Sequence, residues 1–186
     1  MIGFARSVAV CAALLSPTAG AVTLDFESLA SEFSVGVGRT YSEDGFTLSV
    51  VGGGGAGFVV MGQNQAPYTG STALYLNLLN ITAVLTQDDG ASFSISEIKL
   101  SPLNGIAVTV SFLGTLSDGG TVSQAFTTAD GFTLQTFEFD PSFTDLVTLE
   151  WDQVSPAHQF DDLVVTSDVA AVPLPPTLLL LLGGLG

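Results

Sequence analysis

The sequence predicts an all-β protein, a two-sheet antiparallel β-sandwich of the jelly-roll type, with an N-terminal signal segment and a C-terminal apolar tail. Three features of residues 22–168 favour this fold class. Apolar and polar residues alternate with period two, β-branched and aromatic residues are frequent, and Asp-Gly pairs separate short segments. Helical periodicity is nearly absent, and no repeat of about 20 to 50 residues suggests a propeller or solenoid.

Residues 1–21 are predicted to be a signal peptide. Arg6 gives a short basic start, residues 7–15 are small and apolar, and Ala19 and Ala21 supply the small residues that a signal peptidase requires. The single cysteine, Cys11, lies inside this segment, so we expect a mature chain without disulfides or thiol ligands. The mature domain must then be stabilised by its apolar core, for which residues 22–168 are long enough.

The alternation predicts strands in the body of the chain, and Asp-Gly pairs mark the tight turns between several of them. In residues 107–113, Val108, Val110 and Phe112 share one face of the predicted strand, while Thr109 and Ser111 share the other, so one side is buried and the other solvated. A jelly roll would bury both inner faces and limit exposed edges. The predicted strands are 22–26, 45–51, 58–61, 73–78, 83–87, 92–100, 107–113, 121–127, 134–139, 146–151 and 160–166.

The mature chain is strongly acidic. After removal of the signal segment, only Arg39 and Lys99 oppose the 18 carboxylates. A surface of this charge repels the phosphates of nucleic acids and anionic lipids, so no nucleic-acid partner is expected. It attracts hard divalent cations such as calcium, although acidity that serves only solubility is an equally good interpretation.

Four carboxylates are candidate metal ligands. First and last strands lie side by side in many jelly rolls, which would bring Asp25 and Glu27 opposite Asp161 and Asp162. Carboxylates held that close need a bound cation or shifted pKa values to offset their repulsion. We therefore expect a structural calcium site with Glu27 and Asp161 as its main ligands, the alternative being four solvated strand ends.

Trp151 and His158 flank the loop between the last two predicted strands, where they could present an aromatic platform and a hydrogen-bonding group to a sugar. The alternative is a core tryptophan and an exposed loop histidine. Because His158 is the sole histidine and no nucleophile-elbow pattern is present, neither a zinc site of the usual kinds nor a Ser-His-Asp triad is expected. No carboxylate pair is identifiable as catalytic, so an enzyme is not expected and a glycoside hydrolase is the least favoured reading.

The chain changes character at its C-terminal end. Residues 169–176 form a proline-rich linker, and residues 177–186 are almost entirely Leu and Gly. The motif Val172-Pro173-Leu174-Pro175 before this apolar run resembles a PEP-CTERM-type sorting signal, which implies processing by an exosortase-type enzyme and contact with the membrane through the tail alone. Only about ten apolar residues follow, half of a spanning helix, and no Arg cluster ends the chain. We expect either a truncated tail or a released protein.

The body is similar to the β-sandwich domains that precede PEP-CTERM tails, which resemble galactose-binding or lectin-like jelly rolls. The stretches that carry this similarity are 24–27 (Leu-Asp-Phe-Glu), 93–100 (Phe-Ser-Ile-Ser-Glu-Ile-Lys-Leu) and 160–165 (Phe-Asp-Asp-Leu-Val-Val). The sequence thus predicts an exported, non-enzymatic structural or adhesive module at the cell surface or in the extracellular matrix. The alternative is a calcium-dependent carbohydrate-binding module that binds an extracellular polysaccharide.

Overall fold

The computed structural model describes residues 20–168, and within this range the chain is built from strands and one short 3-10 turn. The predicted sorting motif, the apolar tail and most of the signal segment lie outside the described residues, while Ala21 begins the first strand. No helix among residues 20–168 is long and apolar enough to span a bilayer. The elements are β1 (Ala21–Leu24), the 3-10 turn η1 (Glu27–Leu29), β2 (Val35–Gly38), β3 (Thr40–Glu43), β4 (Phe46–Val51), β5 (Phe58–Val60), β6 (Leu74–Leu76), β7 (Thr82–Gln87), β8 (Phe93–Pro102), β9 (Thr109–Leu116), β10 (Thr121–Thr127), β11 (Gln135–Glu138), β12 (Leu146–Asp152) and β13 (His158–Ser167).

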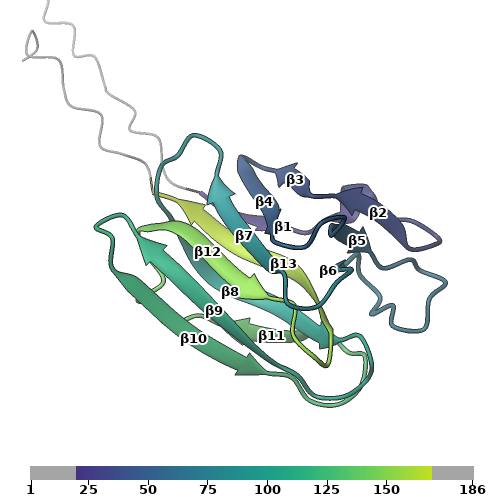
Figure 1. The fold of residues 1–186 in the computed structure, drawn as a ribbon. Coiled ribbons are helices and arrows are strands. Elements are labelled where there is room, and N and C mark those ends of the chain that lie inside the picture. Colours follow the sequence, from purple (N-terminus) through teal and green to yellow (C-terminus); the bar gives the residue numbers. More distant parts are fainter. Residues whose placement is uncertain (1–19, 169–186) are drawn as a thin grey trace, which may run out of the picture.

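The strands are all antiparallel and follow one hydrogen-bonded path that folds over on itself. The order is β2-β5-β6-β13-β8-β12-β7-β4-β3, with β1 beside β13, β11 beside β8, and β9 and then β10 beside β12. The path folds between β8 and β12, which share a single residue pair, Phe93 with Leu146. The result is two layers, named here for their central strands: the β13 layer (β2, β5, β6, β1, β13, β8, β11) and the β12 layer (β3, β4, β7, β12, β9, β10) (Figure 1).

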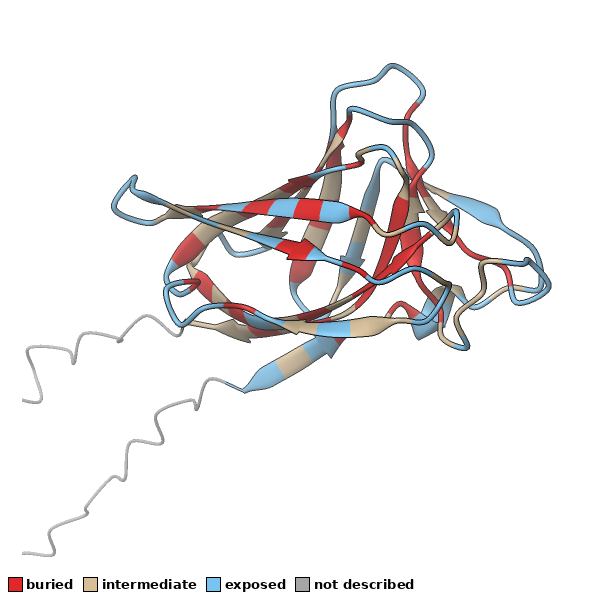
Figure 2. Ribbon diagram, turned by 90° about the horizontal axis from the view of Figure 1, so that it is seen from below, coloured by how far each residue is buried: buried red, intermediate tan, exposed pale blue. Residues whose placement is uncertain are grey.

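The core lies between the two layers and is rich in aromatic rings. Buried and exposed segments alternate along the strands (Figure 2), as period-two side-chain alternation requires. Trp151 of β12 meets Phe160 of β13 with ring centroids 5.0 Å apart, and Phe126 of β10 stacks on Phe137 of β11, also at 5.0 Å. Phe46 of β4 contacts Phe93 of β8 at 5.5 Å. These cross-layer contacts confirm the predicted antiparallel β-sandwich.

Each predicted strand has its counterpart in the structure, with ends shifted by a few residues, but the structure adds β2 and β3. Both of these strands are edge strands, paired only with β5 and β4 respectively. They have no buried residue, and two of the four residues of β2 are glycines, so the alternation of apolar and polar side chains on which strand prediction depends is weak there. Pairing to a neighbouring strand, rather than burial, makes them strands.

Candidate functional site

A β-bulge in β13 sends the two consecutive aspartates, Asp161 and Asp162, into different surroundings. Asp161 pairs with Lys99 of β8 and Val164 with Glu97, so β13 carries one more residue than β8 across this interval. The extra residue is accommodated at Asp162, whose φ is 45°. Its Oδ2 atom accepts a hydrogen bond from the Lys99 Nζ at 2.6 Å.

Asp161 is buried with 0% of its surface exposed. Its Oδ1 atom accepts the backbone N–H of Asp162 at 2.8 Å, but its Oδ2 atom has no hydrogen-bond partner. Burial raises the pKa of Asp161 to about 7, and the negative charges of Asp162 and Glu27 act in the same direction. A buried carboxyl without a compensating partner is costly to ionise, so this atom marks a place where a positively charged group would be favourable.

Glu27 reaches the same region from the N-terminal end of the domain. Phe26 adopts a left-handed conformation with φ 55°, which turns the chain out of β1 and into η1. The Oε1 atom of Glu27 accepts the Ser71 hydroxyl and the Thr72 N–H, both at 3.0 Å, and its Oε2 atom accepts the Thr72 hydroxyl at 2.9 Å. These bonds, the Thr72 N–H first, hold the pKa of Glu27 below its usual value.

Two of the four predicted metal ligands, Asp25 and Asp162, are engaged by other partners, while the charges of both Glu27 and Asp162 act on Asp161. Glu27 and Asp161 are close enough for the charge of Glu27 to raise the pKa of Asp161. Asp25 instead accepts the backbone N–H of Glu27 at 3.0 Å, and Asp162 pairs with Lys99. Within residues 20–168, no three His, Cys, Asp or Glu side chains gather as a metal-binding group. The predicted cluster of four carboxylates is therefore wrong in its membership.

Trp151 and His158 do not form the predicted exposed platform. Trp151 is 2% exposed and packs between Phe112 and Phe160, so neither ring face is free to stack on a sugar. His158 is 0% exposed, neither ring nitrogen has a hydrogen-bond partner, and burial lowers its pKa to about 4. Both residues point into the sandwich because β12 and β13 each extend far enough to place them in phase with core residues. The exposed platform is therefore wrong and the alternative of a core tryptophan is confirmed, but His158 is a buried strand residue rather than an exposed loop histidine.

A feature that the sequence reasoning missed is the outer face of the β12 layer, which is dominated by serine and threonine. We call this surface the hydroxyl face. Hydroxyl groups join across the strands, as in the Thr109–Thr127 contact at 2.8 Å and the Ser42–Thr47 contact at 2.7 Å. The corresponding signal in the sequence is the set of polar residues in the alternating pattern, which by itself predicts only a solvent-facing surface. Its hydroxyl residues are Thr40, Ser42, Thr47, Ser49, Thr82, Thr86, Thr109, Ser111, Thr115, Thr121, Ser123, Thr127 and Thr148.

The strand register arranges this face in straight rows that run across the strands. One row runs through the middle of the layer and contains Leu113, which is 44% exposed, and Glu150 beside it. Neighbouring strands in a sheet lie about 4.8 Å apart, so side chains along such a row recur at that spacing. From β10 to β3 this row consists of Ser123, Leu113, Glu150, Val84, Ser49 and Thr40.

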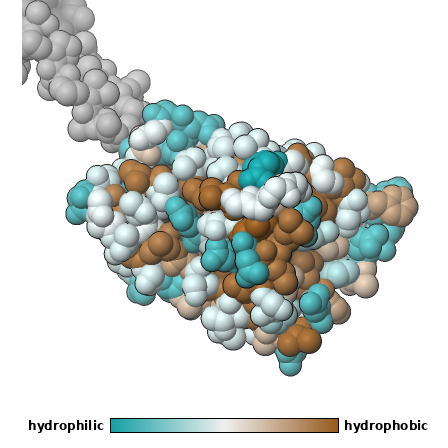
Figure 3. Space-filling view, viewed as in Figure 1, coloured by the Kyte–Doolittle hydropathy of each residue, from teal (hydrophilic) through white to brown (hydrophobic). Residues whose placement is uncertain are grey.

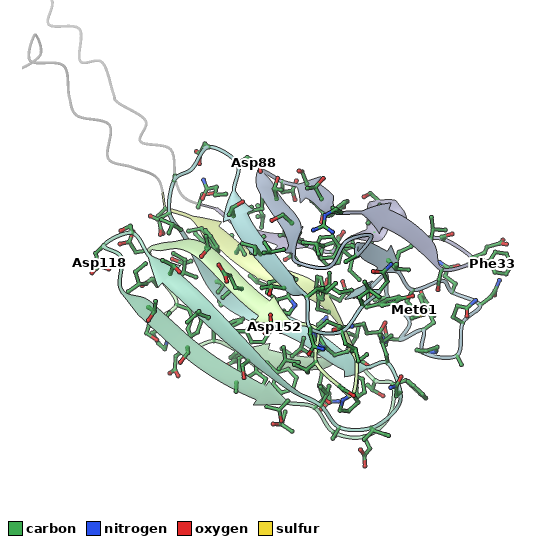
Figure 4. All side chains as sticks on the ribbon, viewed as in Figure 1. Phe33, Met61, Asp88, Asp118 and Asp152 are labelled. Atoms are coloured by element: carbon green, nitrogen blue, oxygen red, sulfur yellow. The ribbon has the colours of Figure 1, made fainter. Side chains whose placement is uncertain are left out.

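A shallow hollow of about 370 Å³ lies on the hydroxyl face over β7, β12, β9 and β10. Asp152, labelled in Figure 4, lies at this hollow, where its Oδ1 atom accepts the Thr82 hydroxyl at 2.6 Å. Residues of intermediate hydropathy cover much of the view in Figure 3, with smaller hydrophilic and hydrophobic patches among them. The hollow thus offers hydroxyl and carboxylate oxygens around one apolar side chain. Its exposed and half-buried lining residues are Thr82, Ser111, Leu113, Ser123, Glu150 and Asp152.

No protein-family model and no curated protein matches this sequence. Among solved structures, the chain is similar to a carbohydrate-binding module of family 29, with a TM-score of 0.41 and 12% identity over 81% of this chain and 90% of that one. It is similar to the CBM22-1 xylan-binding domain from Paenibacillus barcinonensis, with a TM-score of 0.42 and 13% identity over 84% of this chain and 100% of that one. It is also similar to the enzymatically active domain of bacteriophage CBA120 tailspike protein 4, with a TM-score of 0.35 and 16% identity over 66% of this chain and 19% of that one. Similarity at this level identifies no residue of this chain as a ligand-binding residue.

Proposed function

We propose that this protein is an exported, non-catalytic adhesive module that binds a neutral extracellular polysaccharide on the hydroxyl face. The observation that carries the proposal is the hollow at Glu150 and Asp152, where hydroxyl and carboxylate oxygens surround the exposed Leu113. Sugars present groups that complement these. Their ring hydroxyls can donate hydrogen bonds to carboxylates, and their apolar C–H faces can pack on an aliphatic side chain. An open face built of straight strands suits an extended chain better than a small compact ligand.

The charge of the protein defines the class of polysaccharide. Two carboxylates lie at the hollow, and the whole chain carries a formal charge of −15. Uronic acids and sulfated sugars would be repelled by this field, whereas neutral sugars would not. Because the hollow has no exposed aromatic ring among its lining residues, we expect weak affinity that depends on several sugar units binding at once.

The location of this activity rests on the ends of the sequence. The signal segment at residues 1–21 and the motif Val172-Pro173-Leu174-Pro175 support export and sorting by an exosortase-type enzyme, with the protein held at the cell surface or released into the matrix. Processing would be measured by expressing the gene in a host with and without the sorting enzyme and determining the mass of the mature protein. An unprocessed tail in both hosts would contradict sorting.

Binding is tested by affinity electrophoresis through gels that contain a neutral polysaccharide, such as a glucan, a mannan or xylan, or the acidic polysaccharide alginate. We expect retardation by at least one neutral gel and none by alginate. The double variant Glu150→Gln/Asp152→Asn and the blocking variant Ser123→Arg should each weaken retardation about tenfold. The control Glu138→Gln removes the same kind of charge from an exposed position of β11 in the other layer, and it should bind normally.

Two outcomes would overturn the proposal. Absence of retardation in every gel would remove polysaccharide binding, and equal loss in Glu138→Gln and in the hollow variants would show that the effect is net charge rather than the hollow. Release of reducing sugar that disappears in the Glu150→Gln/Asp152→Asn variant would instead identify a glycoside hydrolase.

A further inference from the structure

The segment that joins β5 to β6, residues 61–73, forms a closed loop across the outer face of β13. Its ends meet through a hydrogen bond from the Met61 N–H to the Ala73 carbonyl oxygen at 3.0 Å. Its middle is fixed to β13 where the Gln159 side-chain amide donates to the Pro67 carbonyl oxygen at 2.8 Å. Residues 71 and 72 bind Glu27, so the loop and the turn η1 meet beside Asp161 of β13, and we call this place the Asp161 site.

The Asp161 site contains a carboxylate oxygen that the protein leaves without a hydrogen bond of ordinary geometry. The Oδ2 atom of Asp161 is buried and unpartnered, although the Ser71 hydroxyl lies close enough to lower the pKa of Asp161. The Oγ1 atom of Thr69, which lies in the loop between Pro67 and Ser71, is likewise buried and unpartnered. Buried polar atoms of folded proteins nearly always have a partner, so the Oδ2 atom of Asp161 is a place where a cation or a water molecule would be stabilised. Glu27 adds a negatively charged carboxylate at the rim, where it is exposed.

No cationic side chain of the described residues is available to fill this place. The Lys99 ammonium is held at 2.6 Å by Asp162. The Arg39 guanidinium donates to the backbone carbonyls of Val50, Gly52, Gly53 and Ala56. The Asp161 site therefore combines a buried carboxylate, a second carboxylate and hydroxyl oxygens, and neither cation of the described residues forms an ion pair with them.

We propose that the Asp161 site binds a divalent cation, with calcium as the preferred ion, and that Asp161 and Glu27 are its charged ligands. The Thr69 and Ser71 hydroxyls are the neutral oxygens that the loop supplies. Calcium is favoured because every available donor is oxygen and because the loop can adapt to its irregular coordination, whereas magnesium demands a tight octahedron and zinc prefers nitrogen and sulfur. The ion clamps the 61–73 loop and η1 onto β13, so its role is stability.

This site lies on the outer face of the β13 layer, and the hollow proposed for polysaccharide lies on the outer face of the β12 layer. The two proposals therefore stand or fall separately: calcium should change thermal stability, and the hollow variants should change retention by polysaccharide. Neither proposal requires a metal ion that bridges the sugar and the protein.

The test is thermal melting of the full mature domain after treatment with chelator, with and without calcium. At a calcium concentration about 100 times the dissociation constant, we expect the Tm to rise by about 5 to 10 °C. Asp161→Asn keeps the shape of the side chain but removes its charge, and it should abolish the rise. Asp162→Asn removes the neighbouring charge, which Lys99 already neutralises, and it should retain the rise.

Isothermal titration calorimetry with calcium and with magnesium provides the second measurement. One calcium ion should bind to the wild-type protein and to Asp162→Asn, and none to Asp161→Asn or to Glu27→Gln. An unchanged Tm and no binding heat for the wild type would overturn the proposal, and would show that Asp161 is simply protonated. Binding that survives in Asp161→Asn and Glu27→Gln would also overturn it, because the ion would then lie elsewhere.

Discussion

The Nζ atom of Lys99 lies 2.6 Å from the Oδ2 atom of Asp162, although the residue that Lys99 faces in the strand register is Asp161. The bulge at Asp162 causes this exchange of partners, because it turns the Asp162 side chain toward the ammonium group. Asp161 is left buried without an ion pair, although the charge of Lys99 still acts on it. The one-residue bulge in β13 thus leaves Asp162 paired with Lys99 and Asp161 without an ion pair.

Replacement of Lys99 should destabilise the domain more than replacement of its partner. The Lys99 and Asp162 side chains are 33% and 22% exposed, so the pair itself contributes on the order of 1 kcal/mol. Asp162→Asn should cost no more than that, whereas Lys99→Met also leaves the negative charges of Asp161 and Glu97 without their nearest cation. Urea unfolding at pH 7 in chelator measures both variants, and equal costs would contradict this account.

Arg39 holds the glycine-rich loop at residues 52–57 in place. Its Nη1 atom donates to the carbonyls of Gly53 and Ala56, and its Nη2 atom donates to those of Val50 and Gly52, at 2.8 to 3.1 Å. A planar fork with donors on both amino groups is needed for all four bonds, which a lysine cannot supply. Arg39→Lys should therefore lose most of the stability that Arg39→Ala loses, about 1 to 3 kcal/mol.

Limited proteolysis distinguishes an effect of Arg39 on the loop at residues 52–57 from an effect on the stability of the whole domain. Both Arg39 variants should be cleaved within residues 52–57 at a protease concentration that leaves the wild type intact. The matched control is Lys99→Met, which removes a cation that pairs with Asp162 rather than with this loop, and it should leave the loop resistant. Cleavage elsewhere in the Arg39 variants, with the loop intact, would contradict the proposed clamp.

The alternation in the sequence was sufficient to predict the fold. Val108, Val110 and Phe112 are 2%, 0% and 1% exposed, as their shared phase predicts, and the hydroxyls of Thr109 and Ser111 face outward. Strands without a buried face could not be found this way, which is why β2 and β3 were missed. Pairing at a sheet edge depends on the neighbouring strand and leaves little trace in the strand's own residues.

The candidate sites were less predictable because they depend on local phase and on long-range packing. Trp151 lies two residues from the core residue Leu149, so the alternation itself places its ring inward and favours the core tryptophan over the surface platform. The bulge at Asp162 has no counterpart in the sequence, since an Asp-Asp pair fits a regular strand equally well. The cover of Asp161 comes from residues 61–73, which lie almost a hundred positions earlier and carry no motif that reveals the contact.

Trp151 should contribute to stability and not to polysaccharide binding. Truncation of a fully buried aromatic side chain costs about 3 to 5 kcal/mol, so Trp151→Ala should unfold at much lower urea concentration than the wild type. Trp151→Phe keeps most of the ring contacts with Phe112 and Phe160 and should remain folded. Its retention in polysaccharide gels should equal that of the wild type, and a specific loss of retention would restore Trp151 as a sugar-binding residue.

His158 should make the domain less stable as the pH falls from about 6.5 to about 4. Burial lowers the pKa of His158 in the folded protein to about 4, whereas an unfolded chain binds the proton near pH 6.5. In this interval the unfolded state therefore holds more protons than the folded state, so the free energy of unfolding rises with pH. The difference of about 2.5 pH units corresponds to about 3 kcal/mol, fully lost below pH 4.

The variant His158→Leu isolates this contribution, because leucine fills a similar volume and does not titrate. Carboxylates also titrate in this range, and the buried Asp161, whose pKa is raised to about 7, changes stability in the opposite direction as the pH rises. The titration of these carboxylates is common to the wild type and to His158→Leu, since His158 points into the core and Asp161 toward the outer face. The free energy of unfolding of the wild type, measured in urea at half-unit steps and subtracted from that of His158→Leu, should therefore change by about 3 kcal/mol between pH 6.5 and pH 4. A constant difference would contradict this account, because it would mean that the pKa of His158 is the same in the folded and the unfolded protein.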